Sequence, residues 1–306
     1  MGSLRWEITH CERFVRWDGH PTANTVKLYQ SHCARYADWC RATFGARHYN
    51  DCRVHIQDYA DYLVAAGKTA ATVHTYLAGV CYAYDVPMSN YNKPKRRTID
   101  ITRSRGKKAV DARGDAQPET SPWLYAFADA VGVRRHEYLR LKGEDLVRDE
   151  SGCLCVLVRK GKGGKRQMQR ILPADEAFVA AYFAGVDKNE YIFSKNEMTN
   201  KIDLHHVRAQ VAQRAYGYYL GRLSTEPDYR LQLQSEIKAR WQRENGRQWN
   251  QHEVEGTYYI RGENRKFAIG KGLPVSYDRL AVMATSVFHL SHWRNDVTIC
   301  NYFLAV

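Results

Sequence analysis

No run of about 18 apolar residues occurs in this 306-residue sequence, so no transmembrane helix is expected. The first residues have no apolar core of the kind that a signal peptide carries. The eight cysteines are scattered, and none of them has the spacing of a zinc finger. We therefore expect reduced thiols in a cytoplasmic protein.

A Walker A loop, which binds the phosphates of nucleotides, is also missing. The glycine-rich segment KGKGGK ends at Lys165, but Arg166 follows where the motif requires serine or threonine. Nucleotide binding is therefore not expected at this segment. A lysine at the tip of such a turn is, by itself, usually a solvated surface charge.

Acidic residues are too few to balance the basic ones. The sequence has 46 Lys and Arg against 33 Asp and Glu, a formal net charge of +13 and a pI of about 9.3. This balance favours a polyanionic partner, with nucleic acid first and an anionic membrane surface second. It argues for no particular activity.

Much of the excess charge lies in one segment between Lys93 and Lys108. It holds eight basic residues against the single acid Asp100. The basic residues are Lys93, Lys95, Arg96, Arg97, Arg103, Arg105, Lys107 and Lys108. Two interpretations stay open: a solvated charged loop, or a strap that lies along DNA and displaces its counterions.

Apolar periodicity and charge together divide the chain into three parts. Residues 1–92 carry nine basic and eight acidic residues, and apolar residues there step by three and four as in helices. One such helix face comprises Val26, Tyr29, Cys33, Tyr36 and Cys40. Residues 93–120 lack this periodicity and are expected to be a basic interdomain linker. Residues 121–306 are expected to form a second domain, in which the stretch at about 222–275 is polar and irregular in pattern.

The second domain mixes helical and strand-like patterns. Helical spacing runs from Pro122 to about Leu141 and from His205 to Leu223, and it returns after Ser276. Residues 153–159 alternate like a strand, the glycine-rich turn follows, and residues 166–172 read as the return strand. The predicted fold class is therefore mainly α with a small β-hairpin or sheet (α+β).

Two segments combine an arginine with a nearby acid or histidine. Arg134 has one acid three residues later, Glu137, and another eleven residues later, Asp145. A helix would place Arg134 and Glu137 one turn apart, where they pair. His205 and Arg208 are spaced i and i+3, so a helix would point both at one ligand. Either spacing alone is also common on exposed helices without a function.

A further histidine and tyrosine lie near the end of the sequence. His292 precedes Tyr302 by ten residues. A tyrosine between apolar neighbours is by itself usually a core residue, so this pair means little in isolation.

Taken in order, these segments resemble the tyrosine recombinase family, which includes phage integrases and chromosome-dimer resolvases. GVRRHEYLRLKGEDL resembles the first arginine box of the family, and KGKGGKRQMQRILP resembles its β-hairpin with the active lysine. LHHVRAQVAQRAY resembles the second box, and LSHWRNDVTICNYF resembles the LGH…Y ending. The helical first part and the basic linker are similar to the family's core-binding domain, so the resemblance covers nearly the whole chain.

The resemblance implies a role for each matched residue. The catalytic positions are Arg134, Lys162, His205, Arg208, His292 and Tyr302. The two arginines would hold the scissile phosphate, because a guanidinium fork matches phosphate geometry. The tyrosine would attack phosphorus with help from His205, the lysine would protonate the leaving 5′ oxygen, and His292 would hydrogen-bond the phosphate. Glu137 and Asp145 match acids that are structural.

The sequence departs from the family pattern near its end. Ser291 stands where the family usually has glycine, which predicts an altered turn before His292. The interval from His292 to Tyr302 is one residue longer than the common pattern. The stretch between Arg208 and His292 is much longer than usual, and compared with the family, residues 222–275 look like an insertion. Arg279 is an alternative second arginine, but it lacks the HxxR pattern.

The active lysine has two candidates within the hairpin turn. Lys160 competes with Lys162, and the KGGKR register favours Lys162.

The resemblance also implies an activity and partners. A DNA recombinase of this family forms a 3′-phosphotyrosyl bond, needs no cofactor or metal, and acts on double-stranded DNA as a homotetramer assembled there. A DNA-bending accessory protein, association with the nucleoid and integration or excision of a mobile element are further expectations. Two other functions stay open: a basic DNA-binding protein without catalysis, and a topoisomerase-like enzyme that uses the same phosphotyrosine step.

Overall fold

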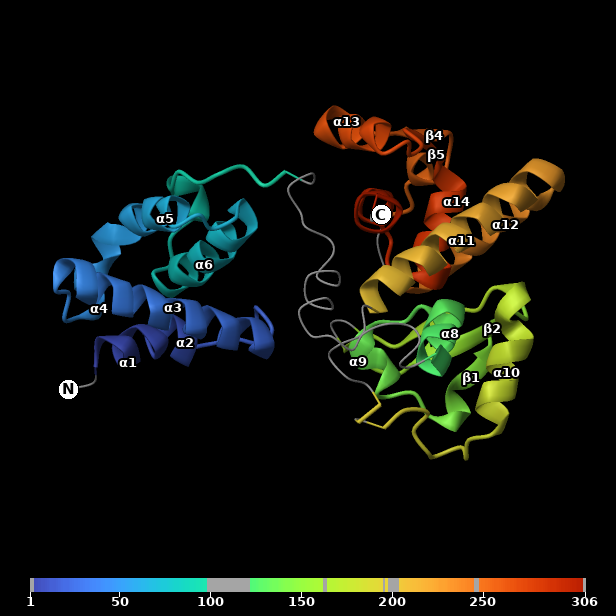
Figure 1. Ribbon diagram of the computed structural model, residues 1–306, viewed down its shortest axis with the longest axis horizontal. Helices are drawn as coiled ribbons and strands as arrows, with labels where there is room; N and C mark the ends of the chain where they lie inside the picture. Colours follow the sequence, from blue (N-terminus) through green and yellow to red (C-terminus); the bar gives the residue numbers. More distant parts are fainter. Residues whose placement is uncertain are drawn as a thin grey trace. The chain divides into compact units, whose positions relative to one another are not determined.

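The computed structural model describes residues 3–97, 122–161, 164–194, 196–197, 204–244 and 248–304. Two compact units, Met1–Ile101 and Thr102–Val306, make up the chain (Figure 1). The described residues are mostly helical and include two small antiparallel sheets, so the predicted α+β class is confirmed. None of the helices within these ranges combines the length and the apolar character needed to span a bilayer.

In the described part of the first unit, all regular secondary structure is helical. Its helices are α1 (Leu4–Thr9), α2 (Glu12–Val15), α3 (Ala23–Phe44), α4 (Tyr49–Cys52), α5 (Ile56–Ala65) and α6 (Ala70–Ala83), with short 3₁₀ turns η1 (Arg53–His55) and η2 (Met88–Asn90). The predicted stripe on α3 is confirmed, because Val26, Cys33, Tyr36 and Cys40 are all buried in the core of this unit. Burial of this stripe against α6 and α1 is what stabilises the bundle.

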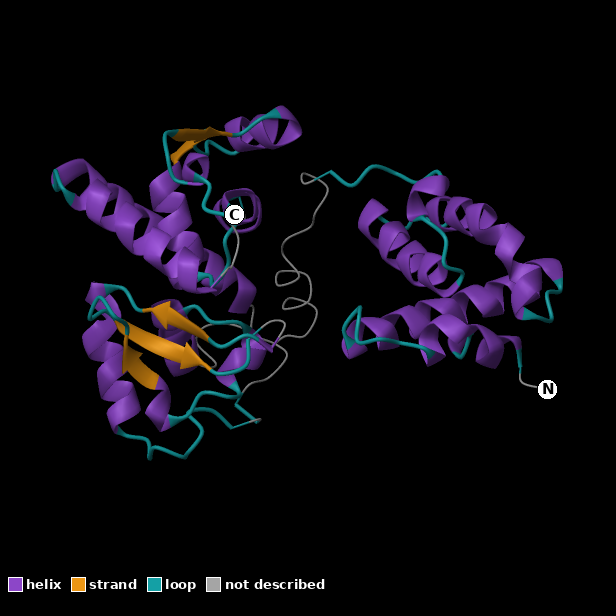
Figure 2. Ribbon diagram, turned by 180° about the vertical axis from the view of Figure 1, so that it is seen from behind, coloured by secondary structure: helices purple, strands orange, loops and turns teal. Residues whose placement is uncertain are grey.

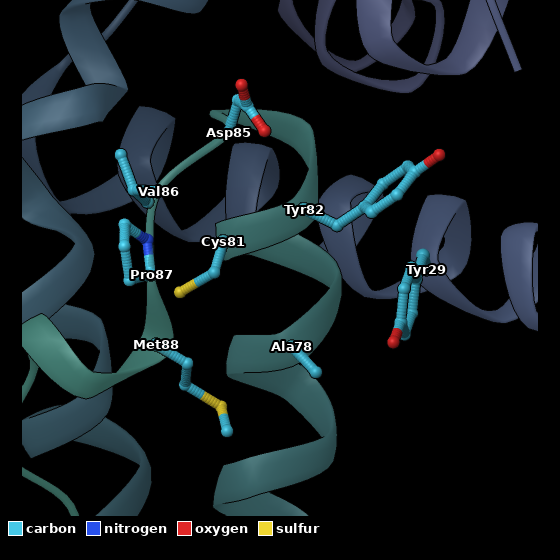
Figure 3. A pocket seen from close by; sticks show the side chains of 8 residues that line it. All are labelled: Tyr29, Ala78, Cys81, Tyr82, Asp85, Val86, Pro87 and Met88. Atoms are coloured by element: carbon cyan, nitrogen blue, oxygen red, sulfur yellow. The ribbon is translucent and has the colours of Figure 1, made fainter. Parts of the chain in front are cut away.

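An open pocket of about 430 Å³ lies in the first unit beside α6. Figure 3 shows Tyr29 and Tyr82 on one side of it and Val86, Pro87 and Met88 on the other. None of the catalytic residues predicted from the sequence lines this pocket.

The second unit contains a three-stranded antiparallel sheet in the order β1 (Leu146–Arg148), β2 (Leu154–Val158), β3 (Gln167–Arg170). Strands β2 and β3 form the predicted β-hairpin, with Val156 opposite Gln169. Helices α8 (Pro122–Val131), α9 (Arg135–Tyr138) and α10 (Glu176–Ala184) accompany the sheet, which is drawn in orange in Figure 2. All five residues of β2 are buried, which accounts for its apolar sequence LCVLV.

The single helix expected from Pro122 to about Leu141 is wrong. Helix α8 ends at Val131, and Gly132 follows with a φ of 64°, a left-handed conformation that glycine adopts without a steric penalty. The chain is extended at Arg134 before α9 begins. The interruption places Arg134 at the N-cap of α9 instead of inside a continuous helix.

The rest of the second unit is a group of helices with a two-stranded sheet. Its elements are α11 (Leu204–Thr225), α12 (Tyr229–Glu244), η8 (Gln251–Glu253), β4 (Thr257–Tyr259), α13 (Gly262–Gly270), β5 (Ser276–Asp278), α14 (Arg279–Ala284), η9 (Thr285–His289), α15 (Asn295–Thr298) and η10 (Ile299–Phe303). Helix α11 confirms the helix predicted from His205 to Leu223. Elements η9 and η10 are π-helical turns, a wide form that often occurs at functional sites.

The irregular structure expected for the segment 222–275 is also wrong. Helix α12 occupies 16 residues of it, and the buried side chains of Tyr229, Leu233 and Ile237 recur every four residues. They belong to the same core cluster as residues of α11 and α14, so the segment has no separate core in its described part. Polar residues on the outer face of α12 outnumber the apolar residues of this narrow stripe. The composition of the segment therefore resembles that of a loop.

Candidate functional site

Arg134 is held at the start of α9 by the acid three residues later. Its backbone N–H donates to Glu137 Oε2 at 2.7 Å, and its Nη1 donates to Glu137 Oε1 at 2.9 Å. The Glu137 side chain is fully buried, so it fixes the arginine by a capping interaction and an ion pair together. The other terminal guanidinium nitrogen, Nη2, donates to the carbonyl oxygen of Leu290 at 3.3 Å.

Arg208 extends from the first turns of α11 into the centre of the second unit and is only 1% exposed. Its Nη1 donates to the carbonyl of Gly132 and, at 3.2 Å, to Gln169 Oε1. Its Nη2 donates to Leu290 O at 2.8 Å. All of these acceptors are neutral, and within the described part of the chain no carboxylate forms an ion pair with Arg208. Its Nε is buried and has no partner there.

The two arginines therefore meet at a single carbonyl oxygen. Leu290 O accepts from both, which brings together α9, α11 and the segment after η9. The close packing of residue 132 against Val211 of α11 favours glycine, because a Cβ added there would lie 2.8 Å from Val211 Cγ1. The result is a buried guanidinium with no carboxylate partner in the described part of the chain, beside a second one that pairs with Glu137.

His292 lies two residues after this carbonyl. Its Nδ1 is 2.8 Å from the Ser286 hydroxyl, and its Nε2 is buried without a partner among the described residues. Burial and the nearby guanidinium groups of Arg208 and Arg134 lower the pKa of His292 to about 3. The ring is therefore neutral at neutral pH.

Tyr302 faces this group from η10 and is 6% exposed. The centroid of its ring is 6.0 Å from that of His292 and 5.5 Å from that of His205. The Cζ atom of Arg208 is 5.8 Å from the same tyrosine centroid. Arg134, His205, Arg208, His292 and Tyr302 thus gather in one place, although they come from four separate segments of the sequence.

The lysine predicted to be catalytic lies outside the described residues. Lys162 is not among the described residues, so the preference for it over Lys160 stays a prediction. Lys160 itself is exposed, and its carbonyl accepts from Arg140 Nη1 at 2.8 Å. The alternative second arginine, Arg279, contacts Thr257 O and the ring of Tyr258 and none of the clustered residues.

The basic segment is described only as far as Arg97. Arg103, Arg105, Lys107 and Lys108 lie outside the described residues. Lys95, Arg96 and Arg97 are exposed. Lys93 is half-buried, and its Nζ donates to the carbonyls of Met88 and Tyr91 at 2.7 and 3.0 Å. Its ammonium group is therefore engaged in hydrogen bonds within the first unit.

Two acids named in the sequence are buried and paired. Besides Glu137 with Arg134, the fully buried Asp145 accepts from Arg159 Nε at 2.7 Å and from the backbone N–H of Lys142 at 2.9 Å. Each carboxylate accepts a hydrogen bond from the backbone N–H three residues earlier and so stabilises a turn of the chain.

Sequence reasoning missed two polar residues that hold the site. Gln169 is fully buried on β3, accepts from Arg208 and donates to the carbonyl of Val131. Ser286, fully buried on η9, contacts His292 and the backbone of Arg294. Ser286 lies outside the motifs, and Gln169 lies in the hairpin motif at a position to which the resemblance assigns no role, so only the distances in the folded chain reveal them.

Ser291 adopts the conformation that the glycine of the family pattern would adopt easily. Its φ is 53°, and its Oγ is buried without a partner among the described residues. The turn before His292 is therefore left-handed at Ser291, which costs a residue with a Cβ about 1–2 kcal/mol.

We expect Ser291→Gly to raise the free energy of unfolding by about 1 kcal/mol, because glycine removes the left-handed penalty but adds chain entropy to the unfolded state. Urea denaturation at pH 7 measures the change. Ser291→Ala, which loses only the hydroxyl, is the control and should gain less. Equal stabilities of the glycine and alanine variants would contradict strain at this turn.

Comparisons with known proteins give little beyond this geometry. No family model matches the sequence, and no curated protein matches it. Among solved structures, the chain is similar to a XerA recombinase, with 17% identity and a TM-score of 0.23 over 69% of this chain and 84% of that one. Values this low support no conclusion about activity, so the function must be judged from the residues of the site.

Proposed function

We propose that the chain cleaves and rejoins DNA strands through a covalent 3′-phosphotyrosyl bond to Tyr302, as a tyrosine-type site-specific recombinase. The observation that carries the proposal is the meeting of Arg134 and Arg208 at Leu290 O, next to Tyr302. A buried guanidinium without a carboxylate partner is costly unless an anion occupies its site. A phosphodiester is an anion of the required shape for a guanidinium fork.

The chemistry follows from the charges. Attack of the Tyr302 oxygen on phosphorus forms one P–O bond, breaks the bond to the 5′ oxygen and passes through a state with extra negative charge on the non-bridging oxygens. Preorganised positive charge stabilises that state most. Arg208 is suited to this task because its hydrogen bonds to three neutral acceptors hold it in place without reducing its charge.

Two protons must move in the same step. His205, whose ring centroid is 5.5 Å from that of Tyr302, is the proposed acceptor of the phenolic proton. Lys162 on the hairpin is the proposed donor to the leaving 5′ oxygen. The energy of the broken bond is kept in the phosphotyrosyl link, so a 5′ hydroxyl can rejoin the strand without ATP, cofactor or metal.

The remaining parts of the proposal concern assembly. Residues 1–92 would bind DNA next to the cleavage site, the linker 93–120 would follow the phosphate backbone, and residues 121–306 would carry out catalysis. A homotetramer on two duplexes, with or without a DNA-bending protein, would exchange strands to integrate or excise a mobile element. The exposed Lys95, Arg96 and Arg97 support a phosphate-binding linker.

Covalent trapping on nicked duplexes tests the proposal. Wild-type protein is expected to form an adduct that survives denaturing electrophoresis, and Tyr302→Phe is expected to form none. Tyr277→Phe is the matched control, because it removes a hydroxyl from another buried tyrosine of the same core cluster and should leave the adduct intact. Tight DNA binding without any adduct would favour a DNA-binding protein that lacks catalysis.

A further inference from the structure

The hydroxyl of Ser286 meets three polar groups of the turn that contains His292. Its Oγ is 2.8 Å from His292 Nδ1, 2.9 Å from the carbonyl oxygen of His292 and 3.3 Å from the backbone N–H nitrogen of Arg294. Ser286 is fully buried, so water does not compete for these contacts. A hydroxyl supplies one hydrogen and two lone pairs, which matches three contacts in number.

These contacts determine where the hydrogen atoms lie. The carbonyl oxygen of His292 can only accept, so it takes the single hydroxyl hydrogen. The N–H of Arg294 can only donate, so it uses one lone pair of Oγ. The second lone pair faces His292 Nδ1, and the contact is favourable only if Nδ1 carries a hydrogen. In the neutral ring, Nε2 then carries none.

The surroundings of the ring keep it neutral in the free protein. The charged and titratable groups that face it come from α11, α9, α15 and η10: Arg208, Arg134, Arg294, Asp296 and Tyr302. Burial and the three guanidinium groups lower the pKa of His292 to about 3, and Asp296 opposes them only weakly. Nε2 therefore carries no hydrogen and has no partner among the described residues, in a ring whose surroundings are mainly positively charged.

We propose that Ser286 is a positioning residue that holds the hydrogen of His292 on Nδ1, so that Nε2 takes up one proton from solvent when a phosphate oxygen binds beside Arg208. The proposal rests on the phosphate site of the proposed function. A bare ring nitrogen accepts hydrogen bonds and repels a phosphate oxygen, whereas the imidazolium donates to it. Because Ser286 anchors Nδ1, the ring gains a donor at Nε2 only by protonation.

Charge balance makes this uptake favourable once an anion is bound. In the free site, the uncompensated charge of Arg208 opposes a second cation. A bound phosphate compensates that charge, and the cleavage transition state adds further negative charge on the non-bridging oxygens. Protonated His292 would balance this extra charge, so Ser286 acts on the reaction through His292.

Sulfate is a suitable probe, because it is a tetrahedral dianion that does not titrate near neutral pH. Long-range ¹⁵N–¹H correlation spectra of the full chain labelled at histidine, assigned with His292→Asn, report which ring nitrogen carries hydrogen. We expect hydrogen on Nδ1 alone in the free protein and on both nitrogens with sulfate bound. The sulfate affinity followed at His292 should fall about tenfold per unit rise in pH between about pH 5 and pH 6, as uptake of one proton requires.

Three variants separate positioning from a structural effect. Ser286→Ala should leave both tautomers of His292 populated and reduce the pH dependence of sulfate affinity to less than about threefold per unit. Ser286→Thr keeps the hydroxyl and should restore the wild-type spectrum. Thr285→Val removes a buried hydroxyl that donates to Ala281 O and contacts neither His292 nor Ser286 among the described residues, so it should change neither readout.

The proposal would be overturned by hydrogen on Nε2 of His292 in the free wild-type protein, or by sulfate binding at His292 with the same affinity across this pH range. A Ser286→Ala variant with the wild-type tautomer would do the same. None of these readouts needs Tyr302 to react. Failure here therefore leaves the covalent-trapping result untouched, and failure of trapping leaves the tautomer result untouched.

Discussion

Arg208→Lys is expected to slow strand cleavage by about 10²–10³-fold, the usual effect of removing one preorganised donor from a developing oxyanion. Lysine keeps the positive charge but has no fork, so it cannot bond Gly132 O, Gln169 and Leu290 O together while also facing a phosphate. Single-turnover formation of the protein–DNA adduct measures the rate.

The control for this prediction is Arg214→Lys on the same helix. Arg214 is partly exposed and pairs with Asp129 and Asp175, so the change should alter the cleavage rate by less than about twofold. Thermal unfolding of both variants shows whether the fold is kept. A folded Arg208→Lys protein that cleaves at the wild-type rate would exclude Arg208 from the phosphate site.

Arg170→Ala is expected to lower the free energy of unfolding by about 3–5 kcal/mol, because it leaves the nearly buried Asp149 and the half-buried Glu236 without their cation. Arg170 Nε donates to Asp149 Oδ2 at 2.5 Å, and its Nη2 pairs with Glu236 of α12. Its guanidinium also lies 3.7 Å from the centroid of the Phe288 ring, in the turn before His292. Urea denaturation at pH 7 measures the loss.

A surface pair provides the comparison for Arg170. Arg222, in the last turn of α11, pairs with Glu226 just beyond the helix, and both side chains are partly exposed. In Arg222→Ala, loss of the ion pair should lower the free energy of unfolding by no more than about 1 kcal/mol. Loss of the contact between the Arg222 guanidinium and the Tyr229 ring adds to this. Similar losses in the two variants would show that Arg170 does not fasten α12 to strand β3.

The elements that the sequence predicts well are those with long apolar stripes or clear alternation. Helix α3 and the hairpin of β2 and β3 follow from spacing alone, because each buries one face against a neighbour. The break at Gly132 was missed, because a helical pattern on both sides concealed a single left-handed residue. Helix α12 was missed, because its stripe is narrow and its outer face is strongly polar.

The residues of the candidate site were selected from the sequence, but the groups that support them were not. Arg134, His205, Arg208, His292 and Tyr302 were selected by their order along the chain, and the fold brings them together. The shared carbonyl of Leu290 and the hydroxyl of Ser286 carry no sequence signal, because any residue has a carbonyl and serine is common. Such contacts depend on tertiary distances that no spacing rule encodes.

The most direct test of the central claim is to locate the attachment point of the trapped DNA. Protease digestion of the wild-type adduct, followed by mass spectrometry of the nucleotide-linked peptide, identifies the modified side chain. The account predicts a phosphodiester bond to Tyr302 and a strand with a free 5′ hydroxyl. Attachment at any other residue, or the absence of an adduct on DNA that the protein binds tightly, would contradict it.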